Sequence, residues 1–145
     1  MNWVTLLASN DRRGGSSAER RTAPNDVIWK VAFPDSLRAS PVLYQGVVYV
    51  TCRDGHAYAF DSRTGKARWK LQAAAAIHST PSVSDNLLLF GCDDGAVYAV
   101  DYTSGQLQWK SDGGGEIWTS PTVYGDHVFV GSSDGTVRAV ERSSG

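Results

Sequence analysis

Residues 59–69 read AFDSRTGKARW, and this stretch recurs along the chain. Residues 99–109 read AVDYTSGQLQW, and residues 139–145 read AVERSSG, with no tryptophan after them. The copies begin at positions 59, 99 and 139, an interval of 40 residues. Trp29 lies 40 residues before Trp69, so the tryptophan that the third copy lacks has a counterpart near the other end. The spacing predicts about three 40-residue repeats that are circularly out of phase.

Four short apolar segments make up each repeat. In the first repeat they are residues 40–44, 47–52, 56–61 and 67–71. They are rich in Val, Tyr and Phe and are bounded by turn residues, which is typical of strands. An Asp-Gly pair at positions 54–55, 94–95 and 134–135 separates the second segment from the third, and such a pair favours the positive φ angles of a tight hairpin. With no helical period in any segment, each repeat is expected to form four antiparallel strands.

Units of this kind, stacked around an axis, form a β-propeller. We therefore predict an all-β fold of propeller blades over residues 27–145, with residues 1–26 as an N-terminal tail or linker. The units are residues 40–71, 80–111 and 120–145, and a strand at residues 27–31 completes a blade.

The recurring element resembles the tryptophan-docking repeat of PQQ-type β-propellers. The pattern Ala-x-Asp-x-x-(Thr/Ser)-Gly-x-x-x-Trp, with Ser/Thr-Pro and Asp-Gly at fixed offsets, carries this resemblance over residues 27–145. The superfamily includes quinoprotein alcohol dehydrogenases and the non-catalytic propeller lipoprotein of outer-membrane protein assembly. The resemblance implies that each outer-strand tryptophan docks against the next blade near its glycine-bearing turn, which the aspartate fixes. The residues given this structural role are Trp29, Trp69, Trp109, Gly65, Gly105, Asp61 and Asp101, with Glu141 as a variant of the aspartate.

One position differs between the repeats in a way that suggests a site. The residues two places before the Ser/Thr-Pro pairs are Arg38, His78 and Trp118. With the loop residues Arg53, Asp93 and Ser133, we expect them to rim a central funnel that binds a small ligand or an extended peptide. The alternative is that these are exposed loop positions free to vary.

The sequence offers no convincing catalytic or metal site. His56 and His127 occupy different offsets in their repeats, so they form no evident cluster with His78. Cys52 and Cys92 share one register, too far apart for a disulfide between neighbouring repeats, and are expected to be free buried thiols with Ser132 as the third equivalent. The resemblance implies an adjacent cysteine pair and acidic calcium ligands in members that bind the quinone, and neither can be matched here. We expect no cofactor and no enzyme activity.

The net charge of −1 shows no excess of positive charge of the kind that binds nucleic acid. No apolar segment reaches the length of a membrane span. With no signal peptide or lipoprotein cysteine visible, a cytoplasmic location is the default expectation.

Three repeats are too few to close a propeller ring. Two chains could associate head to tail into six blades, with residues 27–31 of one chain supplying the strand missing after Gly145 of the other. Alternatively, the chain is a fragment of a longer propeller. We predict a non-catalytic β-propeller module that acts as a binding or assembly scaffold. The alternative is a fragment of a PQQ-dependent quinoprotein dehydrogenase or of another propeller-bearing multidomain protein.

Overall fold

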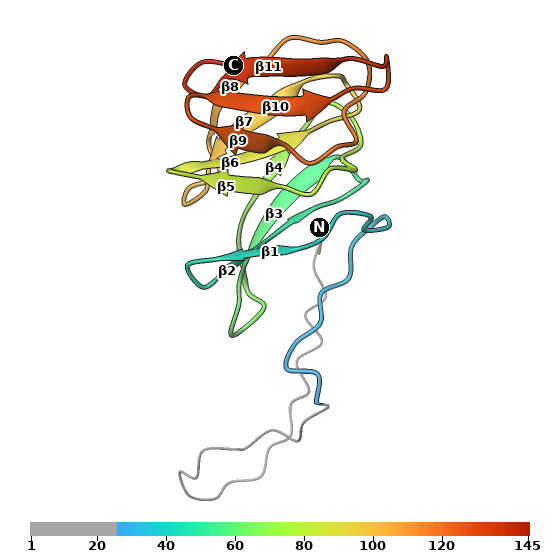
Figure 1. The fold of residues 1–145 in the computed structure, drawn as a ribbon. Coiled ribbons are helices and arrows are strands. Elements are labelled where there is room, and N and C mark those ends of the chain that lie inside the picture. Colours follow the sequence, from blue (N-terminus) through green and yellow to red (C-terminus); the bar gives the residue numbers. More distant parts are fainter. Residues whose placement is uncertain (1–25) are drawn as a thin grey trace, which may run out of the picture.

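The computed structural model describes residues 26–145, and its regular elements are all strands in three stacked antiparallel sheets (Figure 1). The first blade contains β1 (Val42–Tyr44), β2 (Val47–Thr51), β3 (His56–Asp61) and β4 (Ala67–Gln72). The second contains β5 (Ser82–Ser84), β6 (Leu87–Gly91), β7 (Val97–Asp101) and β8 (Leu107–Lys110). The third contains β9 (Thr122–Tyr124), β10 (His127–Gly131) and β11 (Val137–Glu141). Strands are paired in sequence order within each blade, so the predicted all-β blade architecture is confirmed.

Residues 27–31, predicted as a strand that completes a blade, do not form a strand in the single chain. These residues have no assigned strand, although Trp29 occupies the position expected from the repeat. The outer strand of a blade pairs with the third strand of that blade, as β4 does with β3. The described residues contain no third strand that precedes Trp29, so its backbone has no ladder to join. The predicted tail at residues 1–26 lies outside the described residues except for Asp26, and among those described no helix could span a membrane.

The Asp-Gly turns form hairpins, and the two residues of each turn have different roles. Only the glycines take a positive φ, at 82° for Gly55 and Gly95 and 84° for Gly135. The aspartate acts through its side chain, because Asp54 Oδ1 accepts a hydrogen bond from the His56 amide at 3.0 Å. Asp94 makes the same bond with the Ala96 amide. The expectation of positive φ at both residues is therefore corrected to glycine alone.

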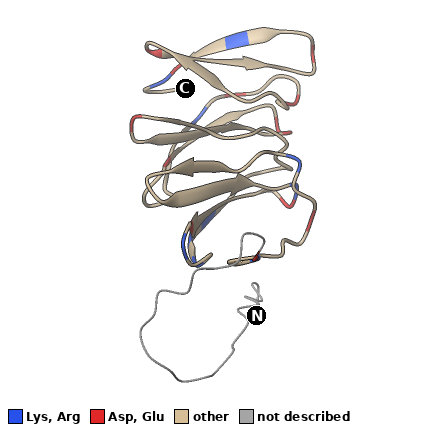
Figure 2. Cartoon of the chain, turned by 60° about the horizontal axis from the view of Figure 1, so that its bottom comes forward, with Lys and Arg blue, Asp and Glu red and all other residues tan. Residues whose placement is uncertain are grey.

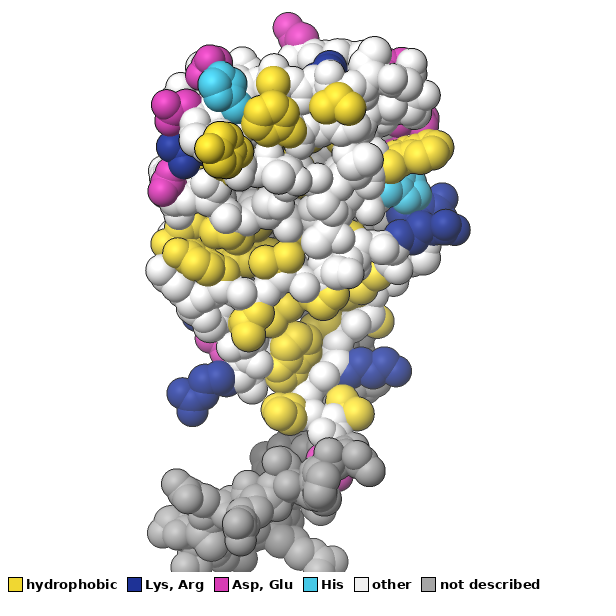
Figure 3. Space-filling model, viewed as in Figure 1, with side chains coloured by type: hydrophobic (Ala, Val, Ile, Leu, Met, Phe, Trp, Pro, Cys, Tyr) yellow, Lys and Arg dark blue, Asp and Glu magenta, His cyan; other side chains and the backbone are white. Residues whose placement is uncertain are grey.

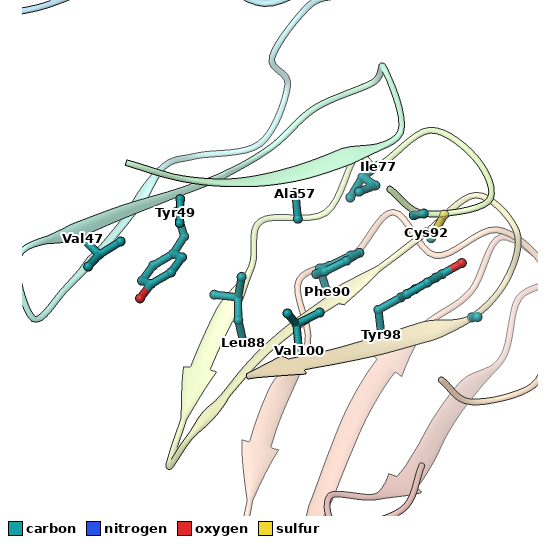
Figure 4. Close-up of a cluster of buried hydrophobic side chains, with 12 residues drawn as sticks. Val47, Tyr49, Ala57, Ile77, Leu88, Phe90, Cys92, Tyr98 and Val100 are labelled. Atoms are coloured by element: carbon teal, nitrogen blue, oxygen red, sulfur yellow. The ribbon is translucent and has the colours of Figure 1, made fainter. Parts of the chain in front are cut away.

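Apolar side chains fill the space between successive blades. Tyr49 and Ala57 of the first blade face Leu88 and Phe90 of the second in one cluster of buried residues (Figure 4). A second cluster joins the second blade to Val128 and Val130 of the third, among other residues. Full burial of one such side chain contributes about 1.5–3 kcal/mol, so these two interfaces are the hydrophobic core.

Each tryptophan of the repeat lies on the glycine turn of the next blade. The indole nitrogens donate hydrogen bonds of 2.9 Å in all three cases: from Trp29 to Ser62 O, from Trp69 to Tyr102 O and from Trp109 to Arg142 O. A Cβ added to Gly105 would lie 2.6 Å from Trp69 Cδ2, and one added to Gly65 would lie 2.7 Å from Trp29 Cδ2. The indole therefore occupies space that only glycine leaves open at this turn.

Replacement of Trp69 by Ala is expected to lower the free energy of unfolding by about 3 kcal/mol, because a large aromatic is lost between blades. Trp69→Phe keeps most of the ring and loses the hydrogen bond to Tyr102, at a cost of about 1 kcal/mol. Trp118→Ala is the control, because Trp118 is 57% exposed and its removal should change stability by less than about 0.5 kcal/mol. Urea denaturation followed by circular dichroism measures all three. Equal losses for Trp69→Ala and Trp118→Ala would contradict the structural role of Trp69.

Candidate functional site

The predicted rim residues lie in two kinds of loop that meet at one end of each blade. His78 and Trp118 are in the loops that cross from one blade to the next, and Asp93 is in the turn between β6 and β7. The Asp93 amide donates to Ala76 O at 3.0 Å, which ties the turn to the crossing loop. Most charged positions among the described residues lie in loops and turns, and others, such as Arg68 in β4 and Arg138 in β11, lie in strands (Figure 2).

Hydroxyl groups fix the backbone beside the rim positions. Ser79 Oγ donates to Gly91 O and accepts from the Gly91 amide, both at 2.8 Å. Thr119 Oγ1 makes the same two bonds with Gly131, at 3.0 and 2.8 Å. Because Ser79 follows His78 and Thr119 follows Trp118, the two rim residues are held at equivalent points of neighbouring blades.

Three of the six rim residues come together in one cluster. His78 Nε2 lies 3.3 Å from Asp93 Oδ2, which makes an ion pair when the imidazole is protonated. The rings of His78 and Trp118 are 6.3 Å apart between centroids, at an interplanar angle of 64°. Asp93 Oδ1 is buried without a hydrogen-bond partner. This His78–Asp93–Trp118 cluster places an imidazole, a partly exposed carboxylate and an exposed indole next to one another.

The other three rim residues lie outside the cluster. Arg53 turns to the preceding loop, where Nη1 lies 3.8 Å from Asp35 Oδ1 and 3.4 Å from Ser36 Oγ. Arg38 is exposed and, within residues 26–145, makes no hydrogen bond or ion pair with the other five. Ser133 is exposed and lines a hollow of about 340 Å³ together with Trp118. The six residues therefore do not form a single ring, and their role in binding stays a prediction.

Asp35 and Ser36 contribute to this end of the first blade and were missed in the sequence. The backbone N–H of Ser36 lowers the pKa of Asp35, with the Arg53 charge acting in the same direction against burial. The equivalent residues of the second repeat are Ala75 and Ala76. This change from alanine to a charged and a polar residue was the signal that could have identified them.

The two cysteines are free and buried, as predicted. Cys92 Sγ lies 3.4 Å from the carbonyl oxygens of Ala75 and Ala76, and Ser132 Oγ donates to Gly115 O at 2.8 Å from the equivalent position. Burial raises the pKa of Cys92 to about 11 and also raises the pKa of Cys52. Both thiols therefore stay protonated at neutral pH and tie the hairpin turn to the crossing loop.

Asp61 and Asp101 hold the turn that carries the docking glycine. Asp61 Oδ1 accepts hydrogen bonds from the Arg63 and Thr64 amides, each at 3.1 Å, and Oδ2 accepts one from Arg68 at 2.9 Å. The Arg68 bond, followed by the bond from the Thr64 hydroxyl, lowers the pKa of Asp61 to about 2. Asp101 binds the equivalent amides, and the Ser104 amide and hydroxyl lower its pKa.

Comparison with known proteins identifies relatives of two kinds. The model of the family described as outer membrane protein assembly factor BamB matches residues 12–111 and 74–145. Among solved structures, BamB from Moraxella catarrhalis aligns with a TM-score of 0.68 at 18% identity, over 75% of this chain and 33% of that one. The quinohemoprotein alcohol dehydrogenase ADHIIG from Pseudomonas putida HK5 aligns with a TM-score of 0.68 at 25% identity, over 77% and 20%. A europium-containing methanol dehydrogenase gives a TM-score of 0.64 at 19% identity, over 74% and 24%.

No curated protein sequence matches the chain. The chain spans about a third or less of each of these three structures. The likeness to BamB and to the methanol dehydrogenase concerns the fold alone.

The dehydrogenases among these relatives raise the question of whether the chain could hold a quinone with calcium. Cys52 and Cys92 lie in the turns of different blades, so they cannot form the adjacent pair expected of a quinone site. Within residues 26–145, no three His, Cys, Asp or Glu side chains converge as metal ligands. The residues of these blades therefore do not fit that cofactor.

Replacement of Asp61 by Asn is expected to reduce stability at neutral pH and to flatten its acid dependence. A carboxylate with a lowered pKa in the folded state stabilises the fold above its unfolded value of 3.8, and this contribution is lost as pH falls toward about 2. The difference between Asp61→Asn and the unchanged chain should therefore shrink over that range. Asp101→Asn is the matched control and should show a smaller effect, because Gln108 stands where Arg68 does.

Urea denaturation midpoints measured across this pH range test the expectation. A constant difference between Asp61→Asn and the unchanged chain at every pH would show that the lowered pKa of Asp61 does not contribute.

Proposed function

The chain belongs to the PQQ-type β-propeller repeat family, and from that premise we propose that it is a non-catalytic module that binds other molecules through the loop end of its blades. The observation that supports this is the His78–Asp93–Trp118 cluster, where the repeated framework carries residues that differ from blade to blade. Propeller relatives divide between an assembly factor and dehydrogenases, and the residues of this chain favour the former role.

The chemistry of the cluster defines the ligand class. The exposed indole of Trp118 presents an apolar face, the imidazole of His78 can donate or accept a hydrogen bond, and the partly exposed Asp93 carboxylate accepts one. An extended peptide with an amide N–H or a basic group next to an aromatic side chain satisfies all three. A small ligand with the same groups would bind in the same way.

The second candidate is a fragment of a quinoprotein dehydrogenase. It is favoured by the 25% identity with the alcohol dehydrogenase, of which the chain spans 20%. Against it stand the separated thiols and the absence, within residues 26–145, of converging metal ligands. The two candidates differ in one visible property, because bound PQQ absorbs visible light and a bare propeller does not.

We expect the chain to select peptides from a displayed random library and to leave PQQ free in the presence of calcium. His78→Ala combined with Trp118→Ala should weaken binding of the selected peptides by at least about tenfold, since each removes a direct contact. Tyr124→Ala is the matched control, because Tyr124 is an 81% exposed aromatic outside the cluster.

Isothermal titration with a selected peptide and an absorption spectrum after dialysis against PQQ and calcium give the two readings. Unchanged peptide affinity in the double variant would contradict the binding role of the cluster. Quinone retained after dialysis would support the dehydrogenase fragment instead.

A further inference from the structure

Within residues 26–145, no further blade covers the two end faces of the blade stack, and both faces carry exposed apolar side chains. On the third blade, at the upper end in Figures 1 and 3, Phe129 is 37% and Val137 is 79% exposed. On the first blade, at the opposite end, a hollow of about 300 Å³ is lined mostly by apolar side chains. Its lining includes Trp29, Val48 and Phe60.

The repeat shows what each open face is built to meet. Between the first two blades, Tyr49 and Ala57 pack in one cluster with Leu88 and Val100. Moving the first pair by two intervals of 40 residues gives Phe129 and Val137 on the open face of the third blade. Moving the second pair back by one interval gives Val48 and Phe60 on the open face of the first. The two open faces are thus the two halves of one more interface between blades.

The hollow on the first blade corresponds to a space that is filled by side chains between the first two blades. Its lining residues Trp29, Val31 and Val48 correspond to Trp69, Leu71 and Leu88, which pack with Tyr49 between the first two blades. The rings of Tyr49 and Trp69 are 5.9 Å apart between centroids. The equivalent of Tyr49 on the third blade is Phe129, which has the size and apolarity to enter the hollow.

A second pair of complementary features has the roles of the two blades exchanged: the first blade supplies the side chain and the third blade supplies the space. Ile117 packs so closely on the second blade that a Cβ at Gly91 would lie 2.1 Å from its Cγ2. The equivalent of Gly91 on the third blade is Gly131, which lines the hollow of about 340 Å³ beside Trp118. The equivalent of Ile117 on the first blade is Leu37, which is 43% exposed. Each open face therefore carries both an exposed apolar side chain and a hollow that can receive one from another blade.

We propose that the open face of the third blade docks on the open face of the first blade of a second copy of this chain. Phe129 and Val137 of one copy enter the hollow beside Trp29 of the other, and Leu37 of that other copy lies on Gly131. Two such contacts related by a two-fold axis close a ring of six blades, which satisfies both ends at once. This proposal concerns the ends of the stack and is independent of ligand binding at the loops.

The docking also gives the residues around Trp29 a neighbouring strand with which their backbone can form hydrogen bonds. In the first blade β3 pairs with β4 with Ala57 opposite Leu71 and Ala59 opposite Trp69. The same register places Val137 opposite Val31 of the second copy and Ala139 opposite its Trp29. The residues around Trp29 then become the fourth strand of the third blade, beside the edge of β11 that pairs with no other strand among the described residues.

Sedimentation equilibrium of the full chain tests the proposal through its mass. The expected species has twice the mass of the 15.6 kDa chain. Val137→Lys and Leu37→Lys should each weaken the dimer on the order of 100-fold or more, because each places a charge without a partner in both contacts. Leu107→Lys is the matched control, since Leu107 is 46% exposed on the outer strand of the second blade and should leave the mass unchanged.

A cysteine pair tests the register independently of stability. Val31→Cys in one chain and Val137→Cys in another should form a disulfide on mixing under mild oxidation, because opposite residues of antiparallel strands have Cα atoms about 4.5–5.5 Å apart, within the range that a disulfide spans. Val31→Cys mixed with Leu107→Cys should not. A monomer at every concentration, a dimer indifferent to Val137→Lys, or equal cross-linking in the two mixtures would overturn the proposal.

Discussion

The packing of an indole on a glycine turn is the contact on which the blade stack depends. It recurs from Trp29 to Gly65, from Trp69 to Gly105 and from Trp109 to Gly145, with the same 2.9 Å hydrogen bond to the blade it touches. Because tryptophan and glycine lie in different blades, the contact sets the position of one blade relative to the next. The apolar clusters between the sheets supply most of the burial, while this contact fixes their alignment.

Much of this fold could be predicted from the sequence because the same strand and turn signals occur in each repeat. Alternating apolar residues and Asp-Gly pairs define hairpins locally, so strand positions followed without knowledge of the tertiary structure. The strand expected around Trp29 is not formed in the single chain, because a strand also needs a neighbouring strand to pair with. The aspartate of the hairpin turn was assigned to backbone geometry, whereas Asp54 acts through its carboxylate.

The candidate site was less predictable than the fold, since it consists of departures from the repeat. A common register placed His78, Trp118 and Asp93 near one another because they occupy fixed loop positions. It did not foresee that Arg53 would pair with Asp35, because side-chain direction depends on local partners that the register does not encode. Repeated positions thus carry the fold, and positions that vary carry the chemistry that distinguishes one blade from another.

A double-mutant cycle between Trp69 and Gly105 tests the central contact most directly. Gly105 has a φ of 76° and a Cβ there would meet the indole at 2.6 Å, so Gly105→Ala carries both backbone strain and a clash. In a chain that already has Trp69→Ala, only the strain of about 1 kcal/mol is expected to remain. The account predicts a coupling of about 1 kcal/mol or more in the free energy of unfolding. Additive losses in the cycle would show that the indole and the glycine turn do not determine how the blades align.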